Sequence, residues 1–111
     1  MKSSQILRLA ADRLPPDRRV GLCSMVHDIE PYSDKSIAIR RKIERDLGEF
    51  AYAPQWLGYV MVYGKRPKGK ISNEQYRVAS DWSSEQSTEK IQAWRRRWAL
   101  NMVKEFESKG D

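Results

Sequence analysis

The amino-acid sequence predicts a mainly α-helical protein, folded as a compact single-domain bundle of about five helices. Apolar residues recur at spacings of three and four along most of the chain, which is the period of one helix face. The 111 residues, 40% hydrophobic and 32% charged, suffice for one hydrophobic core. The sequence contains no internal repeat and no long linker. We therefore expect residues 1–111 to form a single domain.

A first helix is predicted near the N-terminus. Ser3 or Ser4 is expected to accept a hydrogen bond from a free amide at its start. Pro15 and Pro16 end the helix, because proline cannot continue it. The apolar face that we expect to enter the core consists of Ile6, Leu7, Ala10, Ala11 and Leu14.

Two further helices are predicted before residue 50. The second spans 20–29 and ends before Pro31. The third begins at Ser33 or Asp34, either of which is a good N-cap, and ends at Gly48, a candidate C-cap. Their apolar faces consist of Leu22, Met25, Val26 and Ile29 in the second helix and Ile39, Ile43 and Leu47 in the third.

The stretch Pro54–Gly64 carries conflicting signals. Pro54 suits the first turn of a helix, because an amide at that position would have no partner inside the helix. The strand-favouring residues are Tyr59, Val60, Val62 and Tyr63. Because the run is too short for periodicity to decide, we favour a helix and leave open a short strand near 57–63.

Two helices are predicted after the Gly/Pro loop 64–70. Ser72 and Gln75 form a capping-box pattern at the start of one helix, and Ser83 and Ser84 are expected to end it. The last helix begins near Ser87. Its apolar face, the clearest in the sequence, consists of Ile91, Trp94, Trp98, Met102 and Phe106, with Ala99 and Val103 beside it. We expect this face to organise the core.

The net charge of +6, from 21 Lys and Arg against 15 Asp and Glu, suits an acidic partner. Two basic clusters stand out: Lys65, Arg66, Lys68 and Lys70 in the Gly/Pro loop, and the consecutive Arg95, Arg96 and Arg97. The aromatic residues that precede the loop are Trp56, Tyr59 and Tyr63. All of these are candidates for binding a partner protein or nucleic acid. The alternative is a solvated face for the cations and core packing for the aromatic residues.

Cys23 and His27 lie four residues apart, a spacing that would direct both at one metal ion or pair a thiol with an imidazole. The chain has 1 Cys and 1 His, so it has no further soft ligands to complete a zinc site. The segment Gly64–Lys70 has the glycine spacing of a phosphate-binding loop but lacks Ser or Thr after Lys70. We therefore expect no metal, no cofactor and no catalytic site.

The sequence also constrains the compartment. No run approaches the ~20 apolar residues of a membrane-spanning helix, and the N-terminus lacks the apolar centre of a signal peptide. A single cysteine cannot form an internal disulfide, which fits a reducing interior. We expect a cytoplasmic protein without membrane contact.

Four segments carry a resemblance: Ile6–Asp12, Gly21–Cys23, Trp56–Gly58 and Ala93–Leu100. Their order resembles that of small uncharacterised accessory proteins of tailed bacteriophages. The resemblance touches roughly half of the chain and includes no catalytic motif, so it assigns no functional residue. It implies a context, because such proteins often bind a host component stoichiometrically in the infected bacterial cell, including components of defence systems such as CRISPR.

We therefore expect a small non-enzymatic accessory protein that binds and inhibits a host protein or nucleoprotein complex. The alternative is a small basic regulator that binds DNA or RNA directly through the same cations. An exposed face around Trp56 would equally suit a homodimer, so the monomer and the homodimer both stay open.

Overall fold

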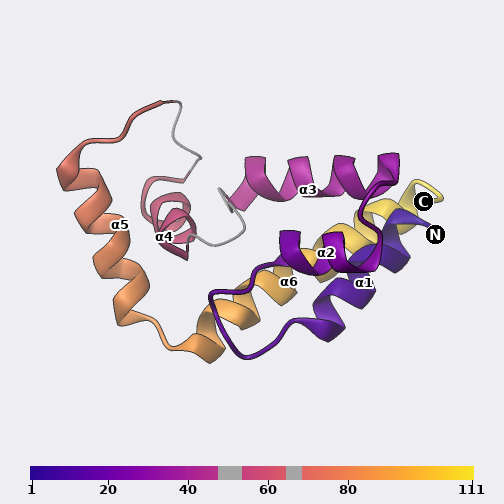
Figure 1. Ribbon diagram of the computed structural model, residues 1–111, viewed down its shortest axis with the longest axis horizontal. Coiled ribbons are helices and arrows are strands. Elements are labelled where there is room, and N and C mark those ends of the chain that lie inside the picture. Colours follow the sequence, from indigo (N-terminus) through magenta and orange to yellow (C-terminus); the bar gives the residue numbers. More distant parts are fainter. Residues whose placement is uncertain (48–53, 65–68) are drawn as a thin grey trace.

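The computed structural model describes residues 1–47, 54–64 and 69–111, and the side chains of residues 54–57 lie outside this description. The predicted helix end at Gly48 is therefore outside the described residues. Six helices occupy most of the described chain (Figure 1): α1 (Ser3–Arg13), α2 (Leu22–Ile29), α3 (Asp34–Leu47), α4 (Pro54–Tyr63), α5 (Asn73–Glu85) and α6 (Thr88–Ser108). The predicted fold class, a mainly α-helical bundle, is confirmed.

The alternative of a short strand near 57–63 is wrong, because this segment lies inside α4. Pro54 is the first residue of the helix, where its missing amide costs no hydrogen bond. A helix satisfies its own backbone groups, whereas a strand needs a paired neighbour, and the described residues contain none. α4 also packs on α5, so tertiary packing outweighs the local strand preference.

The core lies where α1, α2, α3 and α6 meet. α1 packs along α6, and α2 contacts both α1 and α3 (Figure 1). Ala10 and Ala11 of α1 and Ala99 of α6 are fully buried, and side chains this small allow helices to pack closely. The larger buried members of this core are Ile6, Leu7, Leu14, Leu22, Val26, Ile39, Ile43, Leu47, Ile91 and Val103.

The buried face of α6 is rotated relative to the predicted one. Ile91, Ala99 and Val103 are fully buried, and Arg95 lies on the same face at 2% exposure. The large residues that the pattern places at the centre are only partly buried: Trp94, Trp98, Met102 and Phe106. The reason is that the small and β-branched residues of α6 allow close packing at the centre of the bundle, while the larger side chains fill its margin.

α4 and α5 form a closely packed pair beside this core. A Cβ atom built on Gly58 of α4 would lie 2.6 Å from Ser83 Oγ and would overlap the backbone oxygen of Ala79, both on α5. Only glycine therefore permits this approach. Trp82 of α5 contacts Trp94 of α6, with ring centroids 5.4 Å apart, and this contact joins the pair to the rest of the bundle.

Serine side chains cap the starts of α3, α5 and α6. The predicted cap at Ser72 is confirmed, and Ser33 is one of the two candidates predicted for α3. Ser72 Oγ and Ser87 Oγ each accept a hydrogen bond from the amide three residues later, at 3.1 and 3.2 Å. Ser33 Oγ does the same before α3, at 3.1 Å. The predicted end of α5 at Ser83 is wrong, because Ser83 is buried and the helix continues to Glu85.

The start of α1 is capped from the opposite end of the sequence. The prediction that Ser3 or Ser4 is the N-cap is wrong, because Lys2 occupies that position. The Asp111 carboxylate accepts hydrogen bonds from the Ser3 amide at 3.2 Å and the Ser3 hydroxyl at 2.7 Å. Lys35 Nζ donates to the same carboxylate at 2.7 Å. The bonds from Lys35 and then Ser3 lower the pKa of Asp111 from 3.8 to about 2.

Candidate partner-binding surface

The three consecutive arginines of α6 have three different surroundings, because successive helix residues point about 100° apart. Arg95 is 2% exposed. Its Nη1 atom donates to the backbone oxygen of Arg18 at 2.6 Å and to Gln92 Oε1 at 2.7 Å. Arg95 therefore stabilises the fold. The prediction that Arg95 contacts a partner is corrected by this burial.

The same network holds loop 14–21 against α6. Gln92 Nε2 donates to three backbone oxygens of this loop, those of Pro15, Asp17 and Val20, at 2.6, 2.9 and 3.1 Å. Arg18 of the loop donates in turn to the backbone oxygens of Ser83 and Gln86 at the end of α5, at 2.5 and 3.1 Å. These side chains donate hydrogen bonds to backbone carbonyl groups that lie outside the regular hydrogen bonding of a helix. Polar side chains thus join the loop, α5 and α6.

Arg96 reaches the end of α1. It donates to the backbone oxygens of Ala11 at 3.2 Å and Leu14 at 3.5 Å. A cation is favourable at this position, because the last carbonyl groups of a helix carry partial negative charge. Arg96 is partly buried, whereas Arg97 is exposed. Of the three arginines, only Arg97 is exposed.

The other predicted contact residues belong to α4 and the basic loop. Those outside the described residues are Lys65, Arg66, Lys68 and the side chain of Trp56. Lys70 is exposed. Tyr59 is 8% exposed and packs on the 38% exposed Tyr63, with ring centroids 4.6 Å apart. The prediction of Tyr59 as a contact residue is therefore corrected by its burial, while Tyr63 and Lys70 have exposed positions.

The outward side of α6 carries two adjoining grooves that share Arg97 and Asn101. The first, which we call the Trp groove, has a volume of about 250 Å³ and is otherwise lined by Leu47, Met61, Trp94 and Trp98. The second, the basic groove, has a volume of about 370 Å³ and is otherwise lined by Ala93, Arg96, Leu100 and Lys104. We call the two grooves together the α6 face.

The α6 face is positively charged. Among the described residues, three cations and no carboxylate line the basic groove. Within the described residues, Arg97 and Lys104 form no ion pair, in contrast to Arg8, which pairs with Glu107 at 2.9 Å. Cations without a paired carboxylate attract an acidic partner most strongly.

Sequence reasoning missed part of the α6 face. Leu100, Asn101 and Lys104 follow Arg97 at helical spacings of three, four and seven, so the sequence did hold a signal for them. Leu47 and Met61 come from α3 and α4, and no local pattern relates them to α6. Their meeting with Trp94 and Trp98 depends on tertiary packing.

Cys23 and His27, the candidate metal or catalytic pair, both line one groove between α2 and α3 but make different contacts. Cys23 Sγ lies 3.7 Å from the backbone oxygen of Arg40. The His27 ring instead meets Tyr32 edge-on, with centroids 6.4 Å apart. Among the residues that the structure describes, no group of three or more side chains is arranged to hold a metal ion.

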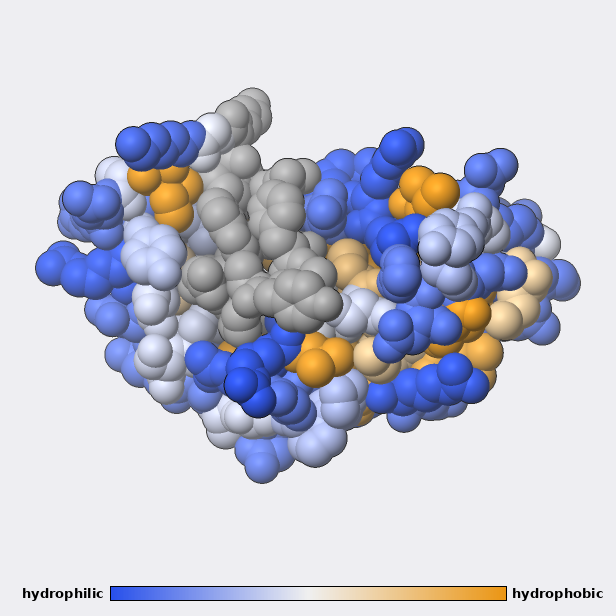
Figure 2. Space-filling model, viewed as in Figure 1, coloured by the Kyte–Doolittle hydropathy of each residue, from blue (hydrophilic) through white to orange (hydrophobic). Residues whose placement is uncertain are grey.

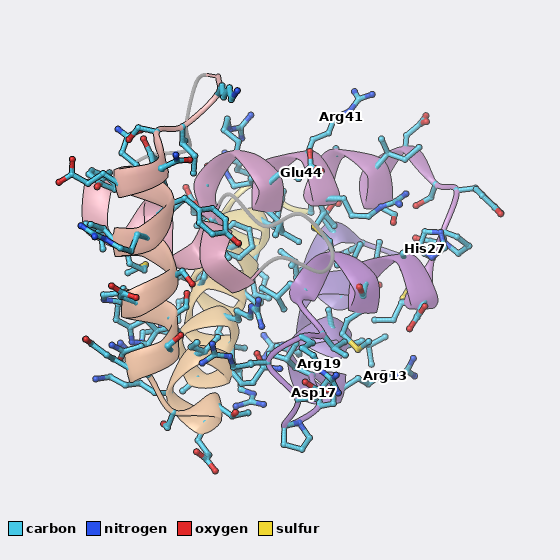
Figure 3. The ribbon with its side chains drawn as sticks, turned by 60° about the vertical axis from the view of Figure 1, so that its left-hand side comes forward. Arg13, Asp17, Arg19, His27, Arg41 and Glu44 are labelled. Atoms are coloured by element: carbon cyan, nitrogen blue, oxygen red, sulfur yellow. The ribbon has the colours of Figure 1, made fainter. Side chains whose placement is uncertain are left out.

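A groove of about 440 Å³ lies beside this pair, between α2 and α3. Its charged lining residues are of both signs: Asp28 and Glu44 against Arg40 and Arg41. Figure 3 shows that Arg41 extends from α3 away from α2. The mixed charge selects neither an acidic nor a basic ligand, so this groove is a weaker candidate than the α6 face.

No protein-family model matches this sequence, and neither a curated protein nor a solved structure matches the chain. The resemblance to phage accessory proteins therefore stays a prediction. None of the helices in the described part of the chain is long and apolar enough to cross a membrane. Figure 2 shows one face of the molecule, on which hydrophilic side chains predominate and apolar ones form small groups.

Proposed function

We propose that this chain is a small non-enzymatic protein that binds a partner protein through the α6 face and inhibits the partner by occupying its surface. The adjoining Trp groove and basic groove are the observation that carries the proposal. Interfaces are commonly anchored by Trp and Arg side chains next to an apolar pocket, with polar groups at the rim. Trp94, Trp98 and Arg97 supply these features on one side of one helix.

The proposed partner is a host protein or nucleoprotein complex in the bacterial cytoplasm. The resemblance to phage accessory proteins supports this choice. The host components that such proteins bind include defence complexes such as CRISPR. The positive charge of the α6 face favours an acidic surface on that partner, because oppositely charged surfaces associate faster and more selectively.

Direct binding to DNA or RNA is the competing function, and the basic groove is the observation that favours it. Phosphate contacts would make log affinity fall with log salt, by about 0.9 for each phosphate on duplex DNA. Phosphates do not account for the apolar lining of the Trp groove, formed by Leu47, Met61 and two Trp residues. We therefore favour a protein partner.

The test is an affinity pull-down of the tagged chain from bacterial lysate, with and without nuclease. Three chains are compared: wild type, Arg97→Glu, and Arg41→Glu as a control. Arg41 is also an exposed helical arginine but lines the α2–α3 groove, so the control changes the net charge equally. We expect a retained protein that survives nuclease, is lost with Arg97→Glu and is kept with Arg41→Glu.

Two outcomes contradict the proposal. Retention that disappears with nuclease indicates binding through nucleic acid. Retention that is equal for wild type and Arg97→Glu excludes the α6 face as the contact surface.

A further inference from the structure

We infer that the α6 face receives an acidic amphipathic helix that carries one large apolar side chain. This inference rests on the proposed function and names the chemistry of the partner segment. It follows from the lining residues of the two grooves and the spacing of the cations.

The lining residues of the basic groove have the spacing of a helix-docking stripe. All of those that the structure describes belong to α6. Ala93, Arg97, Leu100 and Lys104 follow one another at steps of four, three and four, which places them on one stripe of the helix. The stripe is about 16 Å long at 1.5 Å per residue, or three turns. A second helix packs into such a stripe with its own side chains at the same spacing.

The Trp groove suits one apolar side chain rather than a cofactor. Its volume of about 250 Å³ lies below the roughly 300–1,000 Å³ of most small-molecule sites. Apart from Arg97 and Asn101, the described residues that line it are apolar. A large aliphatic or aromatic side chain from the docked helix would therefore be buried between Trp94 and Trp98, and burying such a side chain is favourable.

The cations set the charge of the partner helix. Arg97 and Lys104 are seven residues apart, so they lie on the same side of α6 about 10 Å from each other along its axis. Two carboxylates seven residues apart on the partner helix have the same spacing and would pair with both cations. Complementary charges across an interface speed association and select the partner.

The same charges argue against two other occupants. A second copy of the chain would bring the Arg97 and Lys104 side chains of both copies together, and like charges repel. A nucleic acid would satisfy the cations, but its phosphates would leave the apolar lining of the Trp groove exposed. An acidic helix with an apolar anchor satisfies both grooves.

The experiment measures binding of the full chain to labelled, stapled helical peptides of about 14 residues by fluorescence anisotropy. The test peptide carries one Leu as the apolar anchor and two Glu residues seven apart beside it. One control peptide replaces both Glu residues with Gln, a second replaces the Leu with Ser, and a third replaces both Glu residues with Lys. A single-stranded and a duplex oligonucleotide of random sequence are measured in parallel.

We expect the test peptide to bind, and the Gln and Ser peptides to bind at least about tenfold more weakly. Arg97→Glu should weaken binding of the Glu peptide by about tenfold and strengthen binding of the Lys peptide. Arg41→Glu should change the binding of neither peptide. Equal binding of the Glu and Gln peptides, no binding of the Glu peptide, or stronger binding of either oligonucleotide overturns the inference. If the lysate partner depends on Arg97 and the Glu peptide fails, the proposed function stands and only the acidic helix is refuted.

Discussion

Replacing Gly58 with alanine tests most directly how α4 packs on α5. The added Cβ would lie 2.6 Å from Ser83 Oγ and would overlap the backbone oxygen of Ala79. A hydroxyl can rotate away, but a backbone oxygen inside a helix cannot, so the two helices must separate. Overpacking costs about 1–3 kcal/mol, and we expect the upper end here. The higher helix propensity of alanine offsets about 1 kcal/mol, which leaves a net loss of about 2 kcal/mol.

The assay is thermal unfolding followed by far-UV circular dichroism, with urea titration for the free energy. For a chain of this length 1 kcal/mol lowers Tm by roughly 4 °C, so Gly58→Ala should melt about 8 °C below wild type. Gly69→Ala is the matched control, because a Cβ there meets no atom within 4 Å. It should change the free energy of unfolding by less than about 0.5 kcal/mol. A Gly58→Ala chain that melts with wild type would refute the close approach of α4 and α5.

Three further predictions concern stability. Arg95→Met removes charged hydrogen bonds to the Arg18 carbonyl and Gln92, so urea titration should show a loss of about 2–3 kcal/mol, whereas Arg97→Ala should cost less than about 0.5 kcal/mol. Equal losses would contradict the different burial of the two arginines. Hydrogen bonding, chiefly from Lys35, lowers the pKa of Asp111 from 3.8 to about 2. The ionised Asp111 carboxylate should therefore stabilise the fold fully above pH 3.8, and this stabilisation should be lost as the pH falls toward 2. Asp111→Asn should flatten this part of the plot of Tm against pH, and an unchanged slope would count against the interaction. Ser72→Ala removes the cap of α5 and should cost about 1 kcal/mol, with faster hydrogen exchange in the first turn of α5; unchanged exchange would show that the cap contributes nothing.

Local signals predicted the helices well. The caps at Ser33, Ser72 and Ser87 depend on atoms three residues apart, and the sequence alone predicted Ser72 as a cap, narrowed the cap of α3 to Ser33 or Asp34 and placed the start of α6 near Ser87. The predicted N-cap of α1 was wrong because the groups that accept hydrogen bonds from its first amides belong to Asp111, more than 100 residues away in the sequence. No periodicity within α1 contains that information.

The candidate site was harder to predict than the fold. A run of three arginines looks like one basic cluster in the sequence, yet Arg95 and Arg96 bond to backbone oxygens of the loop and of α1. Whether an arginine is buried depends on where carbonyl groups from other segments come to lie. Tyr59 illustrates the same point, since its burial depends on how α4 packs rather than on its own residue type.

The arrangement of α6 allows stability and binding to be tested separately. The side of the helix that holds Ile91, Arg95 and Val103 is buried in the core, while Arg97 lies about 160° away around the axis from Arg95. Arg97 and Lys104 are exposed and belong to no core contact described above, so substitutions at these two residues should change affinity without changing Tm. Arg95→Met should instead lower both the free energy of unfolding and the amount of folded protein available to bind. A chain with Arg97→Glu that folds as wild type does but captures no partner would therefore locate the function on the α6 face.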